Sequence, residues 1–272
     1  MLHGILKSKL SMLILVLVAL ASCVSSCKKS PQQETPKPPV AEPKTQPAAP
    51  KPVAEPNTAK PATAESAAAH PADWEPIPIV LPKPMFVGTP QSFSGVTNLE
   101  KPSGKPRPPF YAPKGTVNVA AGKSVKSSDQ EPIMGETEWI TNGDKEAADG
   151  SYVEYGPGLQ HVTIDLGAPC ELYAVVLWHY HKQAKVYFDV IVQVADDADF
   201  ITNVRTLFNN DGDNTAGLGI GNDMNYVETS EGKLIEGKGI VARYIRCYSS
   251  GNNSNDMNNY IEVEAYGKLV QK

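Results

Sequence analysis

Proline is scarce after residue 113 of this 272-residue chain, although the sequence contains 24 prolines in all. Twenty-one of them lie between residues 31 and 113, and only three follow. Because proline is excluded from regular helices and central strands, the proline-rich front cannot build a packed core by itself. The distribution predicts one medium-sized domain, residues 116–268, behind a non-globular front, and it argues against two packed domains.

Positive charge is also in short supply in the same region. Residues 115–272 carry 12 Lys and Arg against 23 Asp and Glu. An acidic domain repels phosphate, so we expect no nucleic-acid partner. The sequence also lacks a nucleophile elbow, a Walker loop, an HExxH helix and a haem motif. These absences favour a protein that is not an enzyme.

The apolar run of residues 11–21 is too short to span a bilayer, which takes roughly 20 residues. Lys7 and Lys9 precede it, as in a secretory signal, which we place at residues 1–22. The segment Leu20-Ala-Ser-Cys23 resembles a bacterial lipobox, which implies acylation at Cys23, with Cys27 as the alternative. No aspartate follows either cysteine. We therefore expect a lipid-anchored protein of the bacterial envelope, in the outer membrane or at the cell surface.

Residues 23–72 are dominated by Pro, Ala, Lys, Glu and Thr. So little apolar surface cannot offset chain entropy, which predicts a disordered spacer. Residues 73–115 combine proline with large apolar groups, as in the segment from Trp74 to Val87. We expect this segment to be an extended strap on the domain; a docking epitope for another protein is the alternative.

The C-terminal region alternates apolar and polar residues with the period of half-buried strands at 162–166 and 186–194. Further strands are expected at 172–180, 240–248 and 260–266, with polar turns between them. No helical stripe of useful length is present. The pattern predicts an all-β fold, a β-sandwich or barrel.

Six motifs then occur in the order typical of discoidin (coagulation factor V/VIII type C) domains. They begin at residues 118, 140, 162, 192, 242 and 262, and include Ile164-Asp-Leu-Gly167 and Ala242-Arg-Tyr-Ile-Arg246. The domain resembles this family and its bacterial relatives, the family-32 carbohydrate-binding modules. The resemblance implies a galactose-binding-like jelly roll of about eight strands, acting as a monomer.

The resemblance also implies a structural calcium ion. The matching positions are Asn142, Asp144 and Glu262, with Glu264 as the alternative carboxylate. These side chains carry the oxygen ligands that calcium prefers. The alternative is a turn closed by Asn and Asp side chains without any ion.

The resemblance to family-32 carbohydrate-binding modules implies a carbohydrate or glycoprotein ligand. In the family the contacts to the ligand come from loops at one end of the sandwich. The candidates by position are Trp178, His179, His181, Tyr187, Asn209, Asp211, Asn252 and Asn253. The alternatives are that Trp178 belongs to the core and that the Asn-rich loops are only turns.

Two other functions stay open from the sequence. The protein could be an adhesion or envelope-assembly lipoprotein that binds another protein, or a metal-dependent hydrolase using His179 and His181. Cys170 and Cys247 remain in the domain, and the apolar spacing of Cys247 favours free thiols over a disulfide.

Overall fold

The computed structural model describes residues 70–86, 93 and 95–271. The predicted signal peptide, Cys23, Cys27 and nearly all of the spacer lie outside these residues. In the described part no helix is long and apolar enough to cross a membrane. The only helical element there is the 3-10 turn η1, Thr137–Thr141.

Ten strands make up the rest of the regular structure, which confirms the all-β prediction. They are β1 Trp74–Pro76, β2 Tyr111–Pro113, β3 Val117–Asn118, β4 Ser124–Ser127, β5 Val153–Tyr155, β6 Gln160–His179, β7 Ile191–Ala195, β8 Arg205–Asn209, β9 Lys233–Ser249 and β10 Asn258–Leu269. Strands β3 to β10 form one antiparallel system of eight strands, and β1 pairs with β2 in a separate ribbon.

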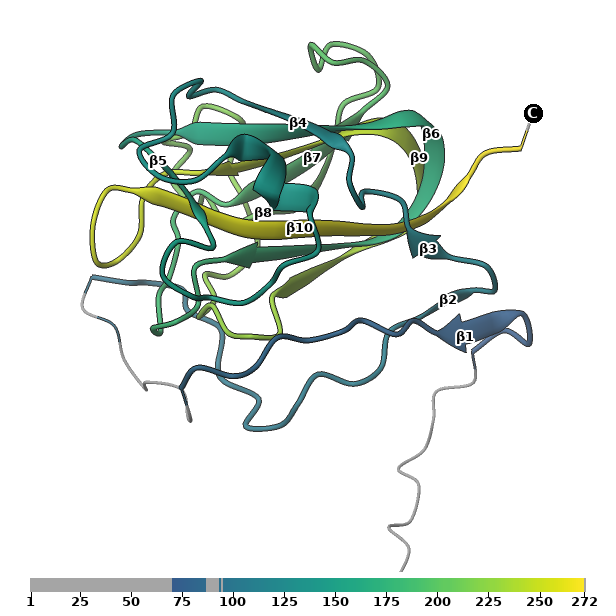
Figure 1. Cartoon of the computed structure of the whole chain (residues 1–272), viewed down its shortest axis with the longest axis horizontal. Coiled ribbons are helices and arrows are strands. Elements are labelled where there is room, and N and C mark those ends of the chain that lie inside the picture. Colours follow the sequence, from purple (N-terminus) through teal and green to yellow (C-terminus); the bar gives the residue numbers. More distant parts are fainter. Residues whose placement is uncertain (1–69, 87–92, 94, 272) are drawn as a thin grey trace, which may run out of the picture. The chain divides into compact units, whose positions relative to one another are not determined.

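Two long strands, β6 and β9, run through both layers of a jelly-roll β-sandwich. The first part of β6 pairs with β4 and with residues 244–249 of β9, and its second part pairs with β10 and with residues 233–242. The register shifts between Asp165 and Cys170, where Gly167 has a φ of 85°. Figure 1 shows both strands curving together at one side of the sandwich.

The main core lies between these layers. Its fully buried members come from both, including Ile164 and Val194 on one side and Leu177 and Val263 on the other. Alternation along the strands therefore predicted the inward faces correctly at 162–166. Cys170 and Cys247 are buried as free thiols in the same core.

The strand expected at 186–194 is shorter than predicted, because regular pairing begins only at Ile191. Asp189 has a φ of 49°, a left-handed conformation that interrupts an extended chain. Val186 and Val190 are nevertheless both buried. The hydrophobic alternation therefore reported burial in a loop as well as in a strand.

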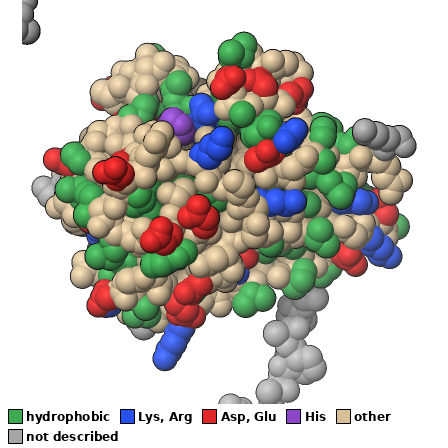
Figure 2. All heavy atoms as spheres, turned by 45° about the horizontal axis from the view of Figure 1, so that its top comes forward, with side chains coloured by type: hydrophobic (Ala, Val, Ile, Leu, Met, Phe, Trp, Pro, Cys, Tyr) green, Lys and Arg blue, Asp and Glu red, His purple; other side chains and the backbone are tan. Residues whose placement is uncertain are grey.

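A second apolar cluster lies on the outer face of the β6–β10 layer, beneath described residues of the segments 74–86 and 95–113. Ile77 and Ala112 pack there with Val176, Trp178 and Ile261. The backbone N–H of Ile77 donates a hydrogen bond to the carbonyl oxygen of Phe110 at 2.8 Å. The described residues of the proline-rich segment thus pack on this face through Ile77 and Ala112 and run beside the sandwich in Figure 1. On the face shown in Figure 2, acidic and basic side chains are interspersed.

Candidate functional site

The sequence-predicted sugar platform, Trp178, is fully buried in the cluster beneath the strap. Its indole Nε1 donates a hydrogen bond to the carbonyl oxygen of Ser230 at 3.0 Å. A ring without an exposed face cannot stack on a sugar. The platform prediction is therefore wrong, and the core alternative describes this residue.

The two histidines are fully buried as well. His179 Nδ1 lies 2.7 Å from Glu228 Oε1, and its ring stacks on that of Tyr187 at a centroid distance of 4.3 Å. His181 Nε2 instead lies 3.0 Å from the carbonyl oxygen of Lys145. Burial and separate partners contradict a catalytic metal site shared by these histidines and open to a substrate.

The remaining predicted ligand residues hold loops together. Tyr187 is buried, and its hydroxyl donates to Asn259 Oδ1 at 2.9 Å. Two of the other side chains donate to backbone carbonyl oxygens: Asn209 to that of Gly219 and Asn252 to that of Met257. Two accept from backbone N–H groups: Asp211 from Thr215 and Ala216, and Asn253 from Val186. These side chains are committed to turns, as the alternative interpretation proposed.

One acidic cluster stands out near these loops. Within the described residues, Asp189, Asp211 and Asp213 form the single group of three His, Cys, Asp or Glu side chains whose ligand atoms lie within 4.8 Å of one another. Asp211 is buried, and both of its carboxylate oxygens already accept backbone hydrogen bonds. The group serves as the closure of a turn and includes neither buried histidine.

The loop predicted to hold calcium does reach the last strand. The backbone N–H of Gly143 donates to Glu262 Oε2 at 3.1 Å. Glu262 Oε1 is buried and has no hydrogen-bond partner among the described residues, and burial raises the pKa of Glu262 to about 8. An orphaned carboxylate oxygen of this kind is one that a cation would satisfy.

The other predicted calcium ligands are partly occupied. Asn142 Oδ1 and Asp144 Oδ1 each accept a backbone N–H two residues later, at 2.7 and 3.0 Å, and each oxygen retains a further lone pair. Glu264 is paired with Lys145, whose Nζ lies 2.6 Å from its Oε1. The donors at Asn142, Asp144 and Glu262 therefore have the oxygen chemistry that calcium prefers, whereas Glu264 is already neutralised by Lys145.

A hollow lined by aromatic rings lies where the strap meets the sheet. It has a volume of about 330 Å³, and its rings come from His70, Trp74, Phe110, Tyr111 and Tyr173. His70 and Tyr111 stack at a centroid distance of 3.9 Å, and Trp74 meets Tyr173 edge-on at 6.3 Å. The chain forms this wall because β1 pairs with β2, which sets Trp74 opposite Pro113.

Charged groups complete the lining of this aromatic hollow. Arg107 contributes a guanidinium, and exposed Glu236 and Lys238 come from β9. Burial lowers the pKa of Arg107 from its ordinary value, and the neighbouring Glu231 partly offsets that effect. Arginine stays charged in either case. The hollow thus combines flat apolar faces with hydrogen-bond donors and an acceptor.

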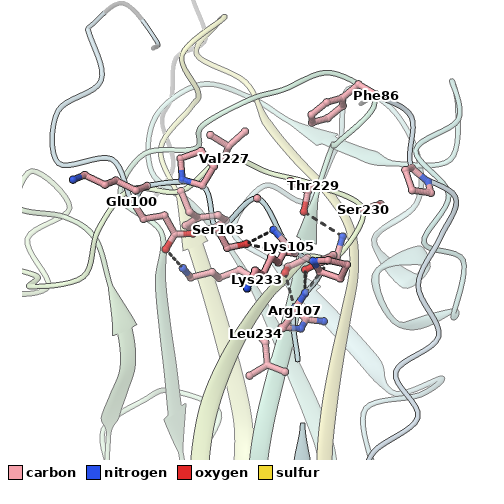
Figure 3. Close-up of a pocket in the computed structure, with 18 of the residues that line it drawn as sticks. Phe86, Glu100, Ser103, Lys105, Arg107, Val227, Thr229, Ser230, Lys233 and Leu234 are labelled. Carbon is pink, nitrogen blue, oxygen red and sulfur yellow. Dashed lines mark hydrogen bonds and ion pairs between the residues drawn. The ribbon is translucent and has the colours of Figure 1, made fainter. Parts of the chain in front are cut away.

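A larger hollow of about 1100 Å³ adjoins it, and the two share Arg107 and Leu234 as lining residues. We call it the polar hollow because charged and hydroxyl side chains line it, together with apolar ones such as Met85 and Val227. Figure 3 shows these two residues at one end of the polar hollow and Phe86 at another. Lys233 Nζ lies 2.8 Å from Glu100 Oε2, and Arg107 Nη1 donates to the carbonyl oxygen of Gly232 at 2.9 Å. Thr229 and Ser230 add hydroxyls to the lining.

The sequence could not have located these hollows from its motifs. Their walls come from His70, the strap, Tyr173 of β6 and residues 226–238, which no family motif covers. The useful signal was the density of aromatic residues in the strap, at Trp74, Phe110 and Tyr111. By itself that density predicts burial or a docking epitope.

No protein-family model and no curated protein matches the sequence. Solved structures that match include the "CBM32 of AlyQ in complex with 4,5-unsaturated mannuronic acid", with 17% identity, a TM-score of 0.38 and coverage of 52% of this chain and 92% of that one. A fucose-binding module of Streptococcus pneumoniae matches with 17% identity, a TM-score of 0.39 and coverage of 57% and 99%.

A family 89 glycoside hydrolase of Clostridium perfringens matches with 21% identity and a TM-score of 0.41, over 57% of this chain and only 15% of the hydrolase. The AlyQ module is a family-32 carbohydrate-binding module, the kind of module that the six sequence motifs resemble. The jelly-roll fold of this chain follows from its own strand pairing.

Proposed function

We propose that this protein is a non-catalytic carbohydrate-binding protein whose ligand site is the aromatic hollow between the strap and β9. The observation that carries the proposal is the set of rings around the hollow, with Trp74 and Tyr173 meeting edge-on at 6.3 Å. A pyranose has a face of C–H groups that packs on such rings. Its hydroxyls need nearby charged or polar groups, which Arg107, Glu236 and Lys238 supply.

The composition of the site favours binding over hydrolysis. Glycoside hydrolysis in most families requires two carboxyl groups placed on either side of the scissile bond. Among the described residues that line the aromatic hollow, Glu236 is the one carboxylate. The arrangement can orient a sugar but offers no acid–base pair.

Titration of the full chain with a panel of mono- and oligosaccharides tests the proposal. We expect Trp74→Ala to weaken binding at least tenfold, because an aromatic side chain contributes about 1.5–3 kcal/mol when buried. Glu236→Ala, an exposed position, should also weaken binding while leaving the thermal unfolding temperature unchanged. Tyr244→Ala is the control, since Tyr244 is partly exposed and lines neither hollow. A silent panel, or unchanged binding by both hollow variants, overturns the proposal.

We further propose that the protein is anchored to the bacterial envelope by acylation at Cys23, on the motif from Leu20 to Cys23. Several acyl chains on one cysteine give stable anchoring, at about 0.8 kcal/mol per buried CH₂. Metabolic labelling with a fatty acid should mark the wild type and Cys27→Ala but not Cys23→Ala. If Cys23→Ala is labelled and Cys27→Ala is not, Cys27 is the acylated residue instead.

Calcium at Glu262 and the oxygens of Asn142 and Asp144 is also proposed, supported by the orphaned Glu262 Oε1. Its contribution would be to order the loop from Asn142 to Asp144 against β10. Addition of calcium to chelated protein should raise the unfolding temperature of the wild type but not of Glu262→Gln.

A further inference from the structure

We infer that the polar hollow extends the aromatic hollow into one groove, and that the groove takes an acidic oligosaccharide carrying carboxylate or sulfate groups. This inference rests on the proposed carbohydrate binding at the aromatic hollow and adds the class of saccharide. It starts from the shared lining: Arg107 and Leu234 border both hollows.

Charge distinguishes the polar hollow from the rest of the domain. Four cationic side chains line it, those of Lys101, Lys105, Arg107 and Lys233, against the two carboxylates of Glu100 and Glu231. Residues 115–272 as a whole are acidic, with 23 Asp and Glu against 12 Lys and Arg. Lys101, Lys105 and Arg107 come from the strap rather than from this acidic region, and the resulting local excess of two positive charges favours an anionic ligand.

The existing contacts leave much of this positive charge available. Lys233 is paired with Glu100 at 2.8 Å. Glu231 accepts the backbone N–H of Arg107, at 3.1 and 3.2 Å, rather than its guanidinium. Among the ion pairs of the described residues neither Lys101 nor Lys105 takes part. Their ammonium groups can therefore meet carboxylate or sulfate oxygens.

The dimensions favour an oligomer over a single sugar. Pockets for small ligands span about 300–1,000 Å³, so the aromatic hollow of about 330 Å³ suits one small unit. The polar hollow adds about 1100 Å³ and continues past Arg107. An oligosaccharide with one sugar unit on the aromatic rings would extend its next units toward Lys101 and Lys105.

Binding of the full chain to three oligosaccharides of equal length tests the inference: a neutral one, a polyuronate and a sulfated one. We expect at least one acidic oligomer to bind about tenfold more tightly than the neutral one, with a stronger dependence on salt. Lys101→Ala/Lys105→Ala should remove that advantage. Lys114→Ala/Lys126→Ala, which removes the same charge at exposed positions outside both hollows, should keep it.

The outcomes separate this inference from the proposal beneath it. Equal binding of all three oligomers, or an advantage that survives Lys101→Ala/Lys105→Ala, overturns the acidic-ligand inference while carbohydrate binding stands. Competition by inorganic sulfate as strong as by the sulfated oligomer would reduce the polar hollow to a simple anion site and also overturn it. No binding by any saccharide defeats the proposed function itself.

Discussion

Gly232 lies directly against the indole of Trp178. A Cβ added at position 232 would stand 2.6 Å from Trp178 Cε2, and the backbone of Gly232 has a φ of 64°. The contact holds residues 229–232, which precede β9, against the buried ring, whose Nε1 donates a hydrogen bond to the carbonyl oxygen of Ser230. It therefore joins one wall of the polar hollow to the cluster beneath the strap.

Gly232→Ala should lower the free energy of unfolding by about 3 kcal/mol, from the strain of a left-handed alanine together with overpacking. Gly143→Ala is the matched control, since Gly143 has a φ of 88° and nothing within 4 Å of an added Cβ. The control should lose about 1–2 kcal/mol. Urea denaturation measures both, and equal losses would show that the Trp178 contact is unimportant.

Ile77→Ala should destabilise the domain by about 2–3 kcal/mol, because Ile77 is buried in the cluster beneath the strap. Val80→Ala is the control: its side chain is 71% exposed, so its loss should stay within about 0.5 kcal/mol. Denaturation of the two variants decides whether the strap stabilises the domain. Similar small losses would favour the alternative in which the strap serves a partner protein.

The buried pair of His179 and Glu228 should be costly to break. Both side chains are fully buried, with Nδ1 and Oε1 2.7 Å apart. Glu228→Leu should lose about 3 kcal/mol, because it leaves the imidazole unpaired, and His179→Leu/Glu228→Leu should recover part of that loss. Lys182→Ala, which breaks the exposed pair with Asp149, should lose less than about 1 kcal/mol. Additive losses in the double variant would show that the pair is not coupled.

Glu262→Gln should stabilise the calcium-free protein at pH 8–9 by on the order of 2–4 kcal/mol and change it little near pH 4. Burial raises the pKa of Glu262 from 4.5 to about 8 in the folded protein. Between these values the folded state keeps a proton that the unfolded state releases, so stability present at low pH is lost as the pH rises toward 8. Glutamine cannot ionise and escapes that loss.

Denaturation across this pH range, in chelator and then in calcium, checks the prediction for Glu262. In calcium at high pH the wild type should be more stable than Glu262→Gln, since only the wild type offers a carboxylate to the ion. Parallel pH profiles for the two proteins in chelator would show that Glu262 does not titrate in this window.

The sequence by itself determined the all-β class and much of the core. Alternation at 162–166 placed Ile164 inside, because successive side chains of a strand point to opposite faces. The same local signal failed at 186–190, where a left-handed Asp189 ends the strand but burial continues. The resemblance to discoidin domains also predicted that Glu262 lies near Asn142 and Asp144, and in the structure Glu262 accepts a hydrogen bond from the backbone N–H of Gly143 between them.

Only the tertiary structure decided which side chains are open to a ligand. Trp178 and His179 carry the right chemistry for a sugar, yet packing of the strap and of residues 226–232 buries them. Trp74 and Tyr173 lie about 100 residues apart in the sequence and meet because β1 pairs with β2 over the outer face of β6. Exposure depends on such long-range packing, which residue spacing along a single chain does not encode.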